Sequence, residues 1–90
     1  MKYRANWASS AEVSFERIWT VCTDKLSVLH TAKTIDSLLT ADPYRTEAVV
    51  QGNERTLVIE PLAVDYAVFE DAKQVIVLKV WMIGYLADQE

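Results

Sequence analysis

Apolar and polar residues alternate at the start of the chain. From Lys2 to Trp7 every odd-numbered residue is apolar and every even-numbered residue is polar, and this period of two predicts a half-buried strand. Ser9 is followed three residues later by Glu12, the spacing of a capping box, in which both side chains bind free backbone N–H groups at a helix start. The sequence therefore predicts a strand and then a helix capped by Ser9.

A long helical pattern follows the first strand. From Ser10 to Thr40 apolar residues recur three or four positions apart, and neither Gly nor Pro interrupts them. A single helix over this stretch would be about 45 Å long, roughly twice the width of a domain of this size. We therefore expect a helical hairpin broken near Thr23 to Ser27, with Asp24 or Ser27 capping the second helix.

The period changes after Asp42-Pro43, because proline disfavours helical geometry in the residue before it. Gly52-Asn53 is a turn signal between two short stretches, Glu47 to Gln51 and Arg55 to Glu60. These stretches form either a short hairpin or a loop that leads into one strand.

Two longer alternating segments, Leu62 to Phe69 and Val75 to Met82, are typical of strands, and the short polar turn between them predicts antiparallel pairing. Their even-numbered residues are all apolar, so we expect that face to pack on the helices and the odd-numbered face to be open. The predicted fold is α+β: an N-terminal strand, a helical hairpin, then an antiparallel sheet of three or four strands packed on the helices. The predicted core places Leu62, Val64, Tyr66, Val68, Ile76, Leu78 and Val80 against Phe15, Ile18, Trp19, Ile35 and Leu38.

Composition restricts the number of domains and the class of function. A chain of 90 residues buries too little surface for two cores, and 51% hydrophobic residues suffice for one, so we expect a single domain over residues 1–90. Cys22 and His30 are the only residues of their kinds and are expected to be structural, and two glycines form no phosphate-binding loop. We expect no metal and no cofactor. No apolar run has the length of a signal peptide or a membrane span, which predicts a cytoplasmic protein that binds no membrane.

The net charge of −4 is unevenly distributed. Residues 1–45 carry six basic and five acidic side chains, whereas residues 46–90 carry three basic and eight acidic ones. Because neutralised phosphates supply most of the non-specific affinity for nucleic acids, this distribution argues against a nucleic-acid surface built mainly from the second half.

The expected open face of the sheet combines charged and aromatic residues. Asp65, Lys79 and Trp81 form either a stabilising cross-strand group or a docking surface, since tryptophan is enriched in binding hot spots. Phe69 and Val77 extend the apolar area of the same predicted face. We expect a second copy or a small protein partner to bind there or at the neighbouring sheet edge.

Three segments carry a resemblance to a known family: Leu38 to Pro43, Pro61 to Val68 and Asp71 to Trp81. They resemble, in this order, the end of the second helix, the central strand, and the hairpin turn with the final strand of the RelE/ParE superfamily. This superfamily comprises toxins of bacterial type II toxin-antitoxin modules, including plasmid stabilization systems. The resemblance covers nearly the whole chain in pattern, and it implies a toxin-like protein with a small antitoxin partner.

The chain departs from the superfamily at positions that RNA-cleaving relatives use. Ala63 and Ala67 stand where the central strand commonly has Arg, and Met82 and Ile83 stand where cleaving relatives often place His or Arg. Phosphodiester transfer needs a base, an acid and positive charge, and each lost group typically costs a factor of about 10² or more. Alanine and isoleucine supply none of these groups.

The candidate catalytic residues are therefore Arg55, Lys79 and Tyr85, the remaining counterparts of the superfamily's basic residues and C-terminal aromatic. Three functions stay open. The first is a toxin that acts by binding, with DNA gyrase as a target; the second is a ribosome-dependent mRNA endoribonuclease with an atypical residue set. The third is a non-toxic interaction module that retains the fold.

Overall fold

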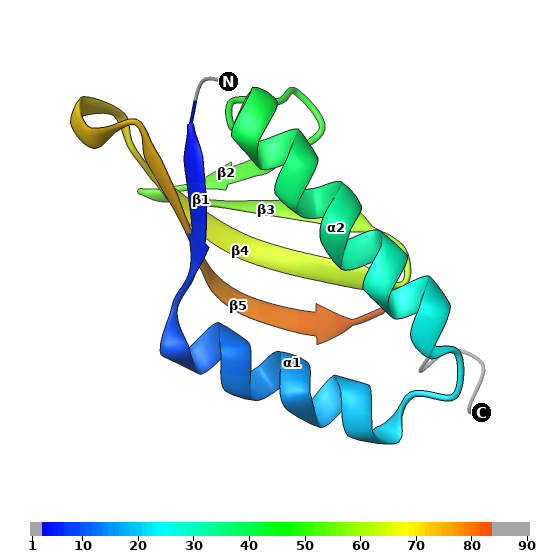
Figure 1. The fold of residues 1–90 in the computed structure, drawn as a ribbon. Coiled ribbons are helices and arrows are strands. Elements are labelled where there is room, and N and C mark those ends of the chain that lie inside the picture. Colours follow the sequence, from blue (N-terminus) through cyan, green and yellow to red (C-terminus); the bar gives the residue numbers. More distant parts are fainter. Residues whose placement is uncertain (1–2, 84–90) are drawn as a thin grey trace.

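The structure, a computed structural model, describes residues 3–83 and consists of one twisted sheet with two helices packed against it (Figure 1). The sheet has five strands in the order β1-β5-β4-β3-β2; β1 is parallel to β5, and all other neighbouring pairs are antiparallel. This confirms the predicted α+β fold. The elements are β1 (Arg4–Trp7), α1 (Ser9–Val21), α2 (Lys25–Ala41), β2 (Val49–Gln51), β3 (Glu54–Ile59), β4 (Leu62–Phe69), a 3₁₀ turn η1 (Glu70–Ala72) and β5 (Gln74–Met82).

The helical pattern is broken where the sequence predicted, between α1 and α2. Asp24 caps α2, and its carboxylate accepts a hydrogen bond from the backbone N–H of Ser27 at 3.1 Å. The capping box at the start of α1 was wrong, because Ala8 is the N-cap and Ser9 is already helical. The backbone N–H of Ala8 donates to the carbonyl of Val77 at 2.8 Å, so pairing with the sheet fixes the point where the helix begins.

Strand β1 and helix α1 share the outer edge of β5. β1 pairs with Gln74 to Val77 only, and α1 runs alongside the rest of β5 (Figure 1). The hydroxyl of Ser10 donates to the carbonyl of Leu78 at 3.0 Å, the first residue of β5 beyond the β1 pairing. Edge strands leave unpaired backbone groups, and here a helix covers them.

A β-bulge decides which residues of β5 face the helices. Asp65 pairs with Lys79, but its neighbour Tyr66 pairs with Val77, so Leu78 is left without a partner. One extra residue shifts the alternation, so the first half of β5 buries odd-numbered residues and the second half buries even-numbered ones. The face assignment of the first half was therefore wrong: Val75 and Val77 are fully buried, whereas Ile76 and Leu78 are partly exposed.

The remaining core predictions agree with the structure. The predicted core residues that the structure buries are Leu62, Val64, Tyr66, Val80, Ile18 and Ile35. Those that pack against this core and remain partly exposed are Val68, Phe15, Trp19 and Leu38. Leu57 of β3 and Leu39 of α2 complete the layer between sheet and helices. Within residues 3–83, neither helix has the length and apolarity that a membrane span requires.

Candidate functional site

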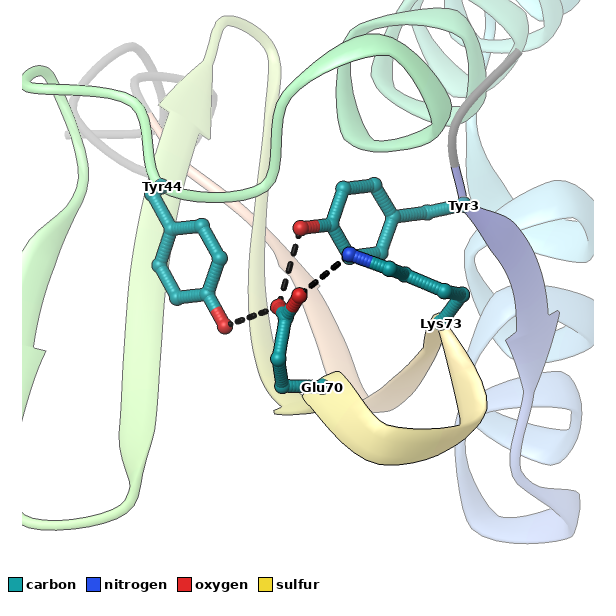
Figure 2. A network of polar contacts seen from close by, with 4 residues as sticks. All are labelled: Tyr3, Tyr44, Glu70 and Lys73. Atoms are coloured by element: carbon teal, nitrogen blue, oxygen red, sulfur yellow. Dashed lines mark hydrogen bonds and ion pairs between the residues drawn. The ribbon is translucent and has the colours of Figure 1, made fainter.

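Three polar side chains, those of Tyr3, Tyr44 and Lys73, meet at the carboxylate of Glu70 beside the β4–β5 turn (Figure 2). The hydroxyls of Tyr3 and Tyr44 donate to Oε1 of Glu70 at 2.9 and 2.7 Å, and Nζ of Lys73 forms an ion pair with Oε2. Tyr3 immediately precedes β1, Tyr44 follows α2, and the two charged residues lie in the β4–β5 turn. We call these four residues the Glu70 cluster.

Local turn chemistry positions the cluster. Asp42, the C-cap of α2, accepts a hydrogen bond from the N–H of Tyr44 at 3.0 Å, an Asx-type turn that directs the chain away from the helix. Lys73 adopts the left-handed conformation, with φ 51°, and this reverses the chain at the end of η1. The N–H of Tyr3 donates to the carbonyl of Thr40 at 3.1 Å, which ties the start of β1 to the end of α2.

Aromatic contacts extend the cluster toward β3. The rings of Tyr3 and Tyr44 meet edge to face, with centroids 6.2 Å apart, and the guanidinium of Arg55 lies 4.9 Å from the Tyr44 ring centroid. Beneath them the buried hydroxyl of Tyr66 donates to the carbonyl of Pro43 at 2.7 Å. The loop after α2 is therefore held to the sheet by both polar and aromatic contacts.

The hydrogen bonds and the ion pair of the cluster all favour the ionised form of the Glu70 carboxylate. Hydrogen bonds from Lys73, Tyr44 and Tyr3 lower the pKa of Glu70 to about 2. The same bonds raise the pKa values of both tyrosines and of Lys73, because on deprotonation each tyrosine would lose the proton that it donates to Glu70 and Lys73 would lose its ion pair. A general acid or base works best with a pKa near the operating pH, and none of these four groups has one. The arrangement suits binding and structural support better than proton transfer.

The open face of the sheet carries a second polar group. Asp65 lies opposite Lys79 on β5 and Thr56 on β3, and its carboxylate accepts a hydrogen bond from the Thr56 hydroxyl. Trp81 lies two residues after Lys79 on the same face, opposite Ala63, and 38% of its surface is exposed. The predicted grouping of Asp65, Lys79 and Trp81 on one face is thus found, together with Thr56.

The three candidate catalytic residues do not form one site. Arg55 pairs with the buried Tyr66 and lies on the helix-covered side of the sheet, whereas Lys79 lies on the open side. Tyr85 lies outside the described residues. The positive charges of Arg55 and Lys79 therefore act on opposite faces and cannot converge on one phosphate.

Of the predicted partner-binding residues, Asp65, Phe69 and Trp81 lie on the open face, and Phe69 is half exposed. The prediction for Val77 was wrong, because the bulge turns this residue into the core, where it is fully buried. Val58 of β3, which lies opposite Ala63 and is half exposed, contributes to the apolar area of this face, whereas Val77 does not.

Sequence reasoning missed the Glu70 cluster. The spacing of Glu70 and Lys73 in a turn is a local signal for an ion pair, but Tyr3 and Tyr44 lie 67 and 26 positions from Glu70. Only the fold brings them together. Among residues 3–83, no group of three or more His, Cys, Asp or Glu side chains is arranged to hold a metal ion.

Taken together, the strand order, the helical hairpin and the closing antiparallel strands define a RelE/ParE-like fold. No protein-family model and no curated protein matches the sequence. Solved structures do match. A chain of the toxin-antitoxin complex RelBE2 from Mycobacterium tuberculosis superimposes with a TM-score of 0.72 at 10% identity, over 91% of this chain and 92% of that one.

Two further toxin structures show the same likeness. A mutant of the Escherichia coli toxin RelE, in complex with an antitoxin RelBc peptide, gives a TM-score of 0.70 at 13% identity, covering 99% of this chain and 94% of that chain. The chromosomal ParDE system from P. aeruginosa gives 0.61 at 16% identity, covering 91% and 97%. Because the sequence identities are only 10–16%, this structural likeness establishes the fold alone.

Proposed function

We propose that this protein is the toxin-like component of a bacterial type II toxin-antitoxin module, of the kind found in plasmid stabilization systems. The observation that supports this most is the shared fold with toxins of both the RelE and the ParE type over at least 91% of the chain. Each of these three structures is described as part of a toxin-antitoxin system or complex. A small antitoxin is therefore the expected partner.

We further propose that the protein acts by binding its target, not by cutting RNA. Arg55 and Lys79 lie on opposite faces of the sheet, and the pKa of Glu70, at about 2, is too low for an efficient general base at neutral pH. Ala63 and Ala67 place no charge on the open face on either side of Asp65. This face instead offers exposed apolar side chains, notably Val58 and Trp81, around Asp65, whose carboxylate accepts a hydrogen bond from the Thr56 hydroxyl.

Inducible expression in a bacterial host tests the toxin-like role. We expect growth to stop on induction and to resume when a cognate antitoxin is supplied. The open-face variant Trp81→Glu should relieve the arrest. Val13→Glu is the matched control, because Val13 is a similarly exposed apolar residue, 48% exposed, on α1. Unimpaired growth at high expression of the folded wild type would favour the non-toxic interaction module.

Two purified assays separate binding from cleavage. Translating ribosomes with a reporter mRNA should show no cutting above background. DNA gyrase, the target that the resemblance in the sequence implies, is tested in a supercoiling assay. Ribosome-dependent cutting that disappears in both Arg55→Ala and Lys79→Ala would overturn the binding mechanism and establish the alternative, an mRNA endoribonuclease.

A further inference from the structure

A hollow of about 620 Å³ lies between α1 and α2, beside β1. The two helices diverge from their connecting loop, and β1 lies between their far ends (Figure 1). A second hollow of about 400 Å³ adjoins the first along α1, and the two share Phe15, Glu16 and Leu29. We call the two together the α1–α2 hollow. Its size is in the range of sites that take small organic molecules.

Aromatic rings form the apolar wall of the α1–α2 hollow. Trp7 of β1 and Phe15 of α1 line its larger part and meet edge to face, with centroids 5.7 Å apart and an interplanar angle of 77°. Trp19 lines the smaller part and stacks on Phe15, with centroids 6.2 Å apart. All three rings pack against the core and remain partly exposed. The rings are therefore held in place and accessible to a cation, which is attracted to an aromatic face.

Carboxylates line the α1–α2 hollow from both helices. Glu12 and Glu16 belong to α1 and Asp36 to α2, against a single basic residue, Lys33. None of these four residues takes part in an ion pair within residues 3–83, and all four are exposed. Asp36 accepts a hydrogen bond from the indole N–H of Trp7 at 3.2 Å, and a carboxylate has lone pairs for further donors. The hollow therefore has negative charge on two walls and aromatic rings between them.

We propose that the α1–α2 hollow binds an aliphatic polyamine, a small molecule with ammonium groups at both ends of a methylene chain. The ammonium groups would pair with carboxylates on the two helices, and the chain between them would lie against the aromatic rings. An uncharged ligand would cover the carboxylates without pairing them, which costs free energy. Within residues 3–83 no three acidic side chains are arranged to hold one metal ion, so the charge distribution favours an extended organic cation.

Titration of the Trp81→Phe variant with cadaverine, a five-carbon diamine, tests the proposal. The substitution leaves Trp7 and Trp19 as the only tryptophans, and both line the α1–α2 hollow. We expect a saturable shift of their fluorescence emission with a Kd of about 1 mM or below, at low and constant ionic strength. Pentylamine carries one ammonium group and should bind about 5-fold or more weakly. Pentanediol has the same chain without charge and should give no shift.

Variants in the same background locate the ligand, and circular dichroism checks that each is folded. Glu12→Gln/Glu16→Gln should weaken cadaverine binding by about 5-fold or more, because two of the pairing carboxylates are lost. Glu54→Gln/Glu60→Gln removes the same charge at two exposed positions outside the hollow and should leave the Kd within about twofold. Phe15→Leu keeps an apolar side chain, removes the ring between the two tryptophans and should weaken binding by about 3-fold or more.

Three results would overturn the proposal. They are binding of pentylamine or pentanediol as tight as that of cadaverine, equal losses in the two double variants, and no saturable shift at about 10 mM cadaverine. The titrations measure ligand binding by the purified protein and do not depend on growth arrest. The polyamine site and the toxin-like role can therefore fail separately.

Discussion

Shortening Val77 to alanine tests which face of β5 packs against the helices. Val77 is fully buried beside the bulge, and the change removes two methyl groups. At about 0.8 kcal/mol per buried methylene-sized group, the lost transfer free energy is about 1.6 kcal/mol. The paired strands on both sides limit collapse around the site, so the remaining cavity should raise the loss of unfolding free energy to about 2–3 kcal/mol.

The neighbouring residue Ile76 provides the matched control. Ile76→Ala removes more carbon atoms than Val77→Ala, but Ile76 lies on the open face and is partly exposed. Its loss should therefore cost about 1 kcal/mol or less. Urea unfolding followed by tryptophan fluorescence, compared at equal m-values, gives both free energies. If Ile76→Ala destabilises the protein as much as Val77→Ala, the bulge and the inverted face are refuted.

Three further predictions concern other contacts. Tyr66→Phe leaves the buried carbonyl of Pro43 without its donor and should cost about 1–3 kcal/mol in the same unfolding assay; a neutral effect would mean that water replaces the hydroxyl. The pKa of Glu70 falls from 4.5 to about 2 on folding, so its stabilising effect is complete above pH 4.5 and is lost as the pH falls toward 2. The difference in Tm between wild type and Glu70→Gln should therefore shrink over that interval, and a constant difference would contradict the depressed pKa. Self-association through the open face should be abolished by Trp81→Glu in sedimentation experiments, and a wild type that is monomeric at micromolar concentration would exclude it.

The sequence alone predicted the type and order of the helices and of β1, β4 and β5, and it left open whether the stretch that forms β2 and β3 is a hairpin or a loop. Alternation identified β4 and β5, and helical spacing identified the hairpin. For the start of α2 the sequence offered Asp24 or Ser27 as the cap, and the structure shows Asp24, whose carboxylate binds the N–H three positions on. The resemblance in the strand motifs led to the same RelE/ParE-like fold that the solved structures share. These signals depend on residues that are close in sequence, so they can be read without knowledge of the tertiary contacts.

Only the tertiary structure decided which side chains share a surface. A single unpaired residue, Leu78, reversed the alternation in the first half of β5 and moved Val77 from the predicted open face into the core. Strand pairing also placed Arg55 and Lys79 on opposite faces, and it brought Tyr3 to Glu70 across 67 positions. The reason is physical: the period of a strand is two, so one bulged residue inverts its faces, and no local pattern encodes the partner across the sheet.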